Sequence, residues 1–366
     1  MKKIVIITIS SLLALILLLG LSGVAYLQIN YSRIGDVELD ITNNQTNNLE
    51  LNNTYSMSTY NIGFGAYDRE FSFFMDNGVT LNGEVLQGEY GRAVSKENAL
   101  KNTNGSIEIL EYLNSDFMLL QEVDTNSTRS YNINQSEMIE EAFYNHASTF
   151  SSNFHSGYLP YPLHDMHGIV NSGIQTLSRY QIQDSNRIEL PVTTAFFAKF
   201  FDLDRCLNIT RYTINGSDKE FVLINCHLSA YDEGGVYRKL QVELLTQLLT
   251  EEYQKGNYVI AGGDFNHEIA NSNFATIKET PIWIQELTNN ELPDGFRIES
   301  SNESPSCRDS DSPYVANESY VAVVDGFLVS ENIEVSYLKN IVSMNTQDIT
   351  FLYSDHNAVK IEFSFK

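Results

Sequence analysis

The sequence has little of several residue types, and each scarcity argues against a class of protein. Seven prolines in 366 residues are too few for a collagen-like or proline-rich chain. Basic residues number 23 against 47 acidic ones, which gives a formal net charge of −24. A surface this acidic repels phosphate backbones at long range, so binding to nucleic acid mainly through charge is disfavoured. Any chemistry on a phosphate group therefore needs a cation to bring the substrate in.

Cysteine is also scarce, because the chain has three, at Cys206, Cys226 and Cys307. Their spacing fits no zinc-binding motif, and three are too few for a disulfide framework. Cys206 and Cys226 flank an expected hairpin with its turn at Asn215-Gly216, where they could face each other across two strands. A disulfide between them and a pair of buried thiols both remain open.

The most conspicuous feature that is present is an uncharged apolar segment from Ile4 to Ile29. It is longer than the ~20 residues that cross a bilayer as a helix, so residues 1–32 are expected to be a membrane anchor. Lys2 and Lys3 precede the segment, and the positive-inside rule then places the rest of the chain outside the cytoplasm. A cleaved secretory signal is the alternative, in which case the protein is secreted. The polar, Asn-rich residues 33–55 are expected to be a tether or a loosely packed lead-in to the domain.

Residues 56–366 show the pattern of one α/β domain. Short apolar runs such as FMLLQE, FVLINCHL and YVIAGGDFN read as buried strands, and Val359 to Phe365 alternates as a strand with one wet face does. Helical periodicity is clearest from Tyr237 to Gly256 and recurs from Ser95 to Leu113. Strands, crossover helices and a hairpin together predict an α/β sandwich. The polar stretch from Pro293 to Asn317 is expected to be a long surface loop.

Polar residues of particular kinds stand where the apolar runs end or begin. Taken alone, each has an ordinary reading, as a solvated strand end, an Asx-turn or a satisfied core histidine. Together they supply oxygen ligands for Mg²⁺ or Mn²⁺, donors for phosphate oxygens, and a carboxylate–imidazole pair that can move a proton. The set comprises Asn61, Glu122, His227, Asp264, Asn266, Asp325, Asp355 and His356.

The segments that carry these residues resemble the endonuclease/exonuclease/phosphatase superfamily, whose fold is DNase I-like. TYNIG, LLQEVD, LSRY, NCHLSAYDEGGVYRKLQ, IAGGDFNH, VVDGFLVS and YSDHNAV occur in the family's order between residues 57 and 363. GGDFN and SDHNAV, in sequence with QE, are the most specific of them. The resemblance implies a four-layer α/β/β/α sandwich with its site at one end.

The resemblance also implies a role for each residue. The cofactor is expected to be Mg²⁺ or Mn²⁺, with metal-site residues Glu122, Asn61 and Asp355. Catalytic roles are expected for His227, Asp264, Asn266, Asp325 and His356. Among these, Asp264 would position or deprotonate the attacking water, Asn266 would orient the phosphoryl group, and Asp325 would accompany His227. Which of the two imidazoles is the acid is left open.

Arg308, in the polar stretch before VVDG, is a further candidate. It could reach a substrate phosphate as a bidentate donor. Pairing with Asp309 or Asp311 is the structural alternative.

The leading expectation for function is a membrane-anchored, extracytoplasmic, divalent-metal-dependent phosphohydrolase that cleaves a phosphodiester or phosphomonoester by in-line attack of an activated water. Its partners would be the phosphoester substrate (lipid, small molecule or nucleic acid) and the membrane, and no protein partner is predicted. One alternative is a DNase I-like endonuclease acting on extracellular nucleic acid. Another, of a different class, is a non-catalytic surface binding module that keeps the fold. Decay of that kind should remove some catalytic-type positions, whereas all eight are present.

Overall fold

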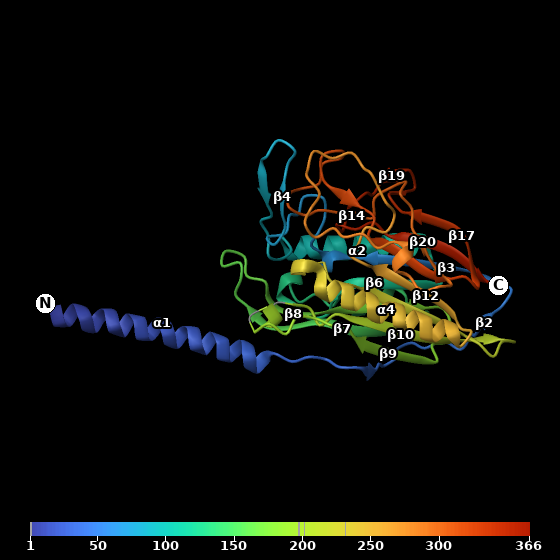
Figure 1. Cartoon of the computed structure of the whole chain (residues 1–366), viewed down its shortest axis with the longest axis horizontal. Helices are drawn as coiled ribbons and strands as arrows, with labels where there is room; N and C mark the ends of the chain where they lie inside the picture. Colours follow the sequence, from blue (N-terminus) through green and yellow to red (C-terminus); the bar gives the residue numbers. More distant parts are fainter. Residues whose placement is uncertain (1, 197, 201, 231) are drawn as a thin grey trace.

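Two β-sheets packed face to face form the body of the protein (Figure 1). The computed structural model describes residues 2–196, 198–200, 202–230 and 232–366. The first sheet has the order β1 (Val37–Glu38), β9 (Asp184–Glu189), β10 (Cys206–Asn215), β11 (Glu220–His227), β12 (Tyr258–Asp264), β16 (Asp325–Ser330) and β13 (Phe296–Glu299), and β2 (Leu49–Glu50) pairs with β10. The second has the order β17 (Ile333–Asn340), β20 (Val359–Phe365), β3 (Thr54–Asn61), β6 (Phe117–Asp124), β8 (Gly168–Ser178) and β7 (Ala147–Leu159).

Aromatic side chains from both sheets fill the space between them. Phe117 of β6 contacts Phe221 of β11 with ring centroids 5.5 Å apart, and Phe221 in turn contacts Phe363 of β20 at the same distance. The inward residues of β20 are buried and its outward ones half-buried, as the alternation from Val359 to Phe365 predicted. Burying large rings on both sides of the interface is the main force that holds the two sheets together.

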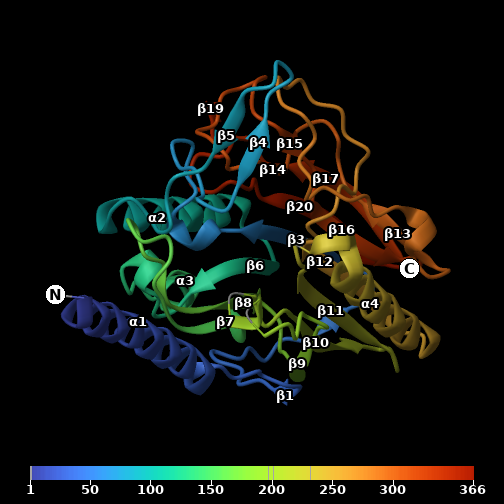
Figure 2. The ribbon, with the colours of Figure 1, turned by 60° about the vertical axis from the view of Figure 1, so that its left-hand side comes forward.

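Helices cover the outer faces of both sheets (Figure 2). On the first sheet, α4 (Val236–Gln254) buries Leu245 and Leu249 against β11 and β12. On the second, α2 (Lys96–Leu113) and α3 (Gln135–Ala142) pack over β3 and β6. Ser95 caps α2 by accepting a hydrogen bond from the Asn98 amide at 3.1 Å. The predicted four-layer α/β/β/α sandwich is therefore confirmed.

Smaller elements lie mostly in the loops at the ends of the sheets. Three short hairpin-like pairs are formed by β4 (Asn77–Val79) with β5 (Val85–Gln87), β14 (Cys307–Arg308) with β15 (Val321–Ala322), and β18 (Ser343–Met344) with β19 (Gln347–Asp348). Single turns of 3-10 helix are η1 (Gly63–Gly65), η2 (Thr128–Ser130), η3 (Ala198–Phe200), η4 (Glu233–Gly235) and η5 (Asn289–Glu291). Because β13 and β14 fall between Pro293 and Asn317, that stretch differs from the long surface loop expected.

The N-terminal apolar segment forms a single helix, α1 (Lys2–Asn30), that projects from the domain (Figure 1). Its most apolar window has a mean hydropathy of 2.9, and none of that window is buried. Length and composition therefore fit a membrane-spanning helix, and a signal sequence has the same character.

The segment 33–55 is attached to the first sheet, so it is a packed lead-in rather than a free tether. Within it, β1 pairs with β9 and β2 pairs with β10, while Leu49 is fully buried. Asn44 completes the attachment by donating its side-chain amide to the Ile182 carbonyl at 2.9 Å. Composition misled here because Asn and Thr can satisfy strand edges by hydrogen bonding without adding apolar bulk.

The three cysteines are free and buried. Cys226 lies opposite Leu207 rather than Cys206 in the β10–β11 ladder. Since neighbouring side chains of a strand point to opposite faces, the Cys206 and Cys226 thiols lie on different sides of the sheet. The hairpin therefore forms with its turn at Asn215-Gly216 but without the disulfide.

Candidate active site

Five strands bring polar side chains to one end of the sandwich. β3 and β6 are parallel, as are β11 and β12, and each of the four carries its candidate residue at or near its carboxyl end. These are Asn61, Glu122, His227 and Asp264. β16 runs antiparallel to β12, so its first residue, Asp325, lies directly opposite Asp264. The carboxyl ends of strands are where α/β sheets commonly place their sites.

A bulge in β6 sets the position of Glu122. The β6–β8 register shifts between Leu120 and Val123, and Glu122 has a left-handed backbone with φ of 54°. This conformation is unfavourable for a residue with a Cβ and is typical of functional sites. The irregularity leaves the Glu122 side chain 24% exposed, beside its buried neighbours.

Asn61 lies at the centre of the cluster and organises its carboxylates. Its Nδ2 donates to Asp264 Oδ2 at 3.0 Å and to Glu122 Oε1 at 3.3 Å. Its Oδ1 accepts the backbone N–H of Gly63 at 3.0 Å. In this orientation Asn61 presents a donor to the site, whereas a metal ligand must present an oxygen.

Asp325 is paired with His356, whereas it was expected to accompany His227. The His356 Nδ1 donates to Asp325 Oδ2 at 2.8 Å. Burial alone lowers the pKa of His356, but the negative charges of Asp325 and Asp264 outweigh it, so the pKa lies well above its ordinary value. The other ring nitrogen, Nε2, lies 3.7 Å from Asp264 Oδ2. Asp325 therefore orients the His356 ring, and Nε2 faces the site.

His227 contrasts with His356. Its Nε2 lies 3.5 Å from Asp264 Oδ2 and 3.9 Å from Glu122 Oε1, while its buried Nδ1 has no hydrogen-bond partner among the described residues. Burial, together with the nearby charge of Arg205, places the pKa of His227 well below its ordinary value. The sequence could not show that the surroundings of His227 favour the neutral form of its imidazole.

The remaining predicted residues reach the same end of the molecule. The Asp355 carboxylate accepts hydrogen bonds from Ser354 Oγ at 3.3 Å and Ser310 Oγ at 3.4 Å. Its charge raises the pKa of Glu122, and Asp264 raises that of Asp355, which shows that the carboxylates lie within electrostatic reach of one another. Asn266 donates its backbone amide to Asp264 Oδ1 at 2.9 Å, and its Nδ2 to the Leu228 carbonyl at 2.8 Å.

The Arg308 backbone N–H donates to the Asp355 carbonyl at 2.9 Å, but the guanidinium of Arg308 is bound to other backbone groups. It is buried, and its two terminal nitrogens donate to four backbone carbonyls, those of Asp309, Ser312, Asp68 and Phe71. No ion pair of Arg308 with Asp309 or Asp311 is found among the described residues, and the phosphate contact stays a prediction. A guanidinium carries five donors, and four of them are used by these carbonyls, while the buried Nε has no partner among the described residues.

Two arginines near the site were missed from the sequence. Arg129 donates to both oxygens of Asp124, at 2.8 and 3.1 Å, and its charge lowers the pKa of Glu122. Arg205 donates to the His227 carbonyl at 3.4 Å, and its Nε is buried without a partner among the described residues. Neither lies in a recognisable motif, so their proximity follows from the fold alone.

The charges of the cluster fit a bound dication. Burial raises the pKa of Glu122 to about 7, and it also raises those of Asp264 and Asp355. One oxygen of Asp325 is buried and finds no hydrogen-bond partner in the part of the chain that the structure describes. Several crowded carboxylates are costly to ionise unless a cation neutralises them, and carboxylate oxygens are the ligands that Mg²⁺ and Mn²⁺ prefer. Asp264, Asp325 and His356 each bring one ligand atom within 4.8 Å of the other two, which is consistent with a metal site.

Comparison with known proteins decides the family. The model of the endonuclease/exonuclease/phosphatase family matches residues 58–334, a span that contains six of the eight candidate residues. The chain belongs to this family. No curated protein matches its sequence. The family's members are metal-dependent phosphoesterases, and the two mixed sheets are those of the DNase I-like fold.

Solved structures share this fold at low sequence identity. TDP2 of D. rerio, humanised by 14 mutations, is 15% identical with a TM-score of 0.51, over 85% of this chain and 99% of that one. The human Nocturnin catalytic domain, with a bound sulfate anion, is 16% identical with a TM-score of 0.52, over 90% and 98%. An endonuclease/exonuclease/phosphatase from Bacteroides vulgatus is 12% identical with a TM-score of 0.53, over 86% and 100%. Such identities show the fold alone.

Proposed function

We propose that the protein hydrolyses a phosphodiester, or a phosphomonoester, by in-line attack of a water molecule, and that it requires Mg²⁺ or Mn²⁺. The observation that supports this most is the convergence of an ionisable dyad, His356–Asp325, with a separate group of carboxylates at one end of the sandwich. Hydrolysis of an anionic ester needs neutralised phosphoryl oxygens, an aligned water and a proton for the leaving oxygen. The cluster contains a group for each need.

Glu122 and Asp355 are the proposed metal ligands. Burial raises the pKa of both carboxylates, and nearby negative charge adds to the effect, from Asp355 on Glu122 and from Asp264 on Asp355. Bound there, a dication supplies a positive charge that neutralises phosphate oxygens and lowers the barrier to attack. Asn61 holds Glu122 in position through its amide N–H.

Asp264 is the proposed residue that orients and deprotonates water. Its Oδ1 is fixed by the Asn266 amide, and its Oδ2 by Asn61, so the carboxylate is aimed before substrate binds. We propose that His356 supplies the proton to the leaving oxygen, because Asp325 fixes the tautomer of His356 and favours its charged form. Neutral His227, beside both Asp264 and Glu122, is left to donate a hydrogen bond to a phosphate oxygen, with Asn266 orienting the phosphoryl group.

The apolar helix α1 supports a membrane-anchored, extracytoplasmic location for the domain, by the positive-inside rule. The charge of −24 weighs against a nuclease that grips its substrate through basic residues.

Hydrolysis of bis(4-nitrophenyl) phosphate by the full chain in detergent tests the proposal. We expect turnover with Mg²⁺ or Mn²⁺, none with excess chelator, and a loss of at least about a hundredfold in Asp264→Ala. Asp218→Ala, on the exposed β10–β11 turn at the opposite end, should retain full activity. If Asp264→Ala and Asp218→Ala turn over equally, the assignment fails.

A further inference from the structure

The exit of α1 and the candidate active site lie at the same end of the domain. β1 runs antiparallel to β9, so the residues that precede Val37 lie beside the carboxyl end of β9 at Glu189. Glu189 lies opposite Cys206, and the start of β10 lies beside the end of β11, where His227 is found. The strand order therefore brings the chain out of α1 directly to the catalytic end.

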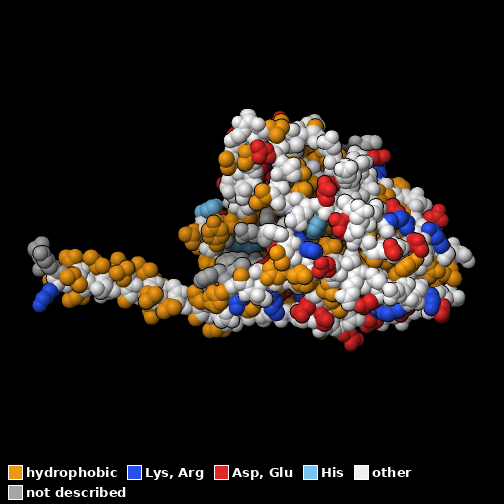
Figure 3. All heavy atoms as spheres, in the orientation of Figure 1, with side chains coloured by type: hydrophobic (Ala, Val, Ile, Leu, Met, Phe, Trp, Pro, Cys, Tyr) orange, Lys and Arg blue, Asp and Glu red, His pale blue; other side chains and the backbone are white. Residues whose placement is uncertain are grey.

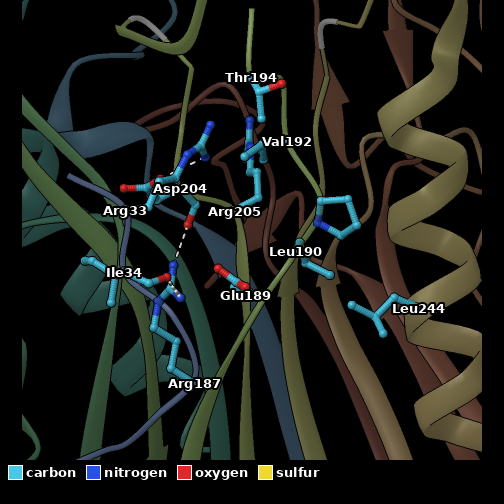
Figure 4. Close-up of a pocket in the computed structure, with 11 residues that line it drawn as sticks. Arg33, Ile34, Arg187, Glu189, Leu190, Val192, Thr194, Asp204, Arg205 and Leu244 are labelled. Carbon is cyan, nitrogen blue, oxygen red and sulfur yellow. Dashed lines mark hydrogen bonds and ion pairs between the residues drawn. The ribbon is translucent and has the colours of Figure 1, made fainter. Parts of the chain in front are cut away.

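The connection between α1 and the domain is short and fixed. Arg33, three residues after the helix, donates to Asp204 Oδ1 at 2.8 Å and to the Thr193 carbonyl at 2.7 Å. Arg187 donates to the carbonyls of Ile34 and Gly35. Figure 4 shows Arg33, Ile34, Arg187 and Asp204 together at this junction. Three residues span at most about 10 Å, so the domain cannot move far from the end of α1.

The β7–β8 hairpin reaches alongside the last turns of α1. The Tyr26 hydroxyl of α1 accepts the Tyr158 backbone N–H at 3.0 Å, and Leu27 packs against Phe154 and Leu159. β7 is parallel to β6, because both run antiparallel to β8. The loop that follows Leu159 is therefore also at the catalytic end.

The end of β7 and this loop carry exposed apolar side chains, Tyr158, Tyr161 and Leu163, which we call the apolar rim. Tyr161 is 60% exposed and Leu163 is 76% exposed. The Tyr161 ring contacts Phe74, at 5.4 Å between centroids, so the rim also adjoins the segment that follows η1. Figure 3 shows hydrophobic side chains gathered on the edge of the domain from which α1 projects. Single exposed apolar residues are ordinary, but these lie level with the end of an apolar helix.

We propose that the apolar rim enters the headgroup region of the bilayer that α1 crosses, and that the substrate is a phosphodiester of a lipid in that bilayer. The inference rests on the proposed function. To this it adds that the site and the exit of α1 lie at the same end of the domain, so the site faces the membrane. Tyrosine is enriched at membrane interfaces, where its ring is buried and its hydroxyl is hydrated. A net charge of −24 opposes an anionic surface, so the lipid is expected to be zwitterionic.

The chemical step is unchanged by this placement. A water oxygen bonds to phosphorus, one of the two ester P–O bonds breaks, and the leaving oxygen takes a proton. A headgroup lying in the bilayer surface would meet the site without leaving the membrane.

A labelling experiment tests the position of the rim without requiring activity. The full chain is reconstituted in phosphatidylcholine vesicles with Leu163→Cys carrying a polarity-sensitive fluorophore, and the three native cysteines are buried. Asp218→Cys, at the opposite end, is the matched control. Lipids with a headgroup-level quencher should quench the label at 163 and leave the label at 218 unchanged. Equal quenching at both positions, no quenching at 163, or loss of α1 from the mature chain would overturn the proposal.

An activity experiment tests the substrate class. We expect Leu163→Ser and Tyr161→Ser to lower the rate of hydrolysis of phosphatidylcholine or sphingomyelin in vesicles by about tenfold. Each substitution removes apolar surface that the proposal places in the bilayer. Hydrolysis of bis(4-nitrophenyl) phosphate in detergent should stay at the wild-type rate. Equal rates on vesicles, or turnover of plasmid DNA but not of lipid, would refute the inference. If the soluble ester is not cleaved by the wild type, the proposed function fails, while the labelling result still reports where the rim lies.

Discussion

His356 and Asp325 join the two sheets of the sandwich at its catalytic end, through a hydrogen bond of 2.8 Å between Nδ1 and Oδ2. Asp325 begins β16 of the first sheet, and His356 lies just before β20 of the second. The dyad therefore forms only when the sheets are packed together. This links the proton chemistry to the integrity of the core between them.

Removing Asp325 should affect turnover through His356. We expect Asp325→Asn to lower kcat by ten- to a hundredfold, because the imidazole loses the carboxylate that orients it and favours its charge. Combined with His356→Ala, it should cost little more than His356→Ala alone. The measurement is a double-mutant cycle with the chromogenic diester. Additive losses would show that the two residues act separately.

Divalent metal should stabilise the fold as well as activate it. The crowded carboxylates at Glu122, Asp264 and Asp355 are relieved by a cation, and a ligand at a hundred times its Kd adds ~2.7 kcal/mol to the free energy of unfolding. We expect saturating Mg²⁺ to raise the Tm of the chelator-treated protein by several degrees. Glu122→Gln should reduce this shift, and Asp218→Ala should not. A shift equal in all three proteins would place the metal elsewhere.

Gly63 is expected to be essential for the geometry of the site. It has φ of +54°, and a Cβ there would lie 3.2 Å from Asp355 Oδ1 and 2.9 Å from the Tyr67 ring. Gly63→Ala should cost ~1–3 kcal/mol of stability and at least about tenfold in kcat/KM. Gly216, with φ of +81° and nothing within 4 Å, is the matched control. Gly216→Ala should share a stability cost but keep full activity, and a Gly63→Ala enzyme with normal turnover would contradict the account.

Acid should destabilise the protein partly through His167. Burial, together with the charge of Arg129, lowers the pKa of this imidazole to about 4, against 6.5 when it is exposed. Between these values the unfolded chain binds the proton and the folded chain does not, so stability falls as the pH drops from 6.5 towards 4. The shift corresponds to ~3 kcal/mol at the lower end. Urea unfolding at pH 7 and pH 4.5 should show a smaller pH effect in His167→Gln than in the wild type. Equal effects would show that another group is responsible.

Much of the fold and the positions of the candidate residues could be predicted from local sequence. FMLLQE, FVLINCHL and YVIAGGDFN each end a buried strand with a polar residue, and those strands lie where the pattern predicted. Pairing partners are not local. Asp325 contacts His356 because of the strand order β12–β16 in one sheet and β20–β3 in the other. Nothing in the sequence near either residue specifies that order.

The same limit explains why the attachment of residues 33–55 and the surroundings of Arg308 could not be predicted. Residues 33–55 lack apolar bulk, and their attachment depends on backbone groups of β9 and β10 that only the fold exposes. Arg308 has the charge expected of a phosphate ligand, but backbone carbonyls of a distant loop at Asp68 and Phe71 take its donors. The sequence shows the chemistry of each side chain, but it does not show which residues that side chain contacts in the fold.

Titration of the chelator-treated chain with Mn²⁺ tests the central claim most directly, with bound metal followed by electron paramagnetic resonance and diester hydrolysis followed in the same samples. We predict that activity rises in parallel with occupancy of a site that Glu122→Gln and Asp355→Asn both weaken. Metal binding unchanged in both variants, or full turnover before any Mn²⁺ is bound, would contradict the account.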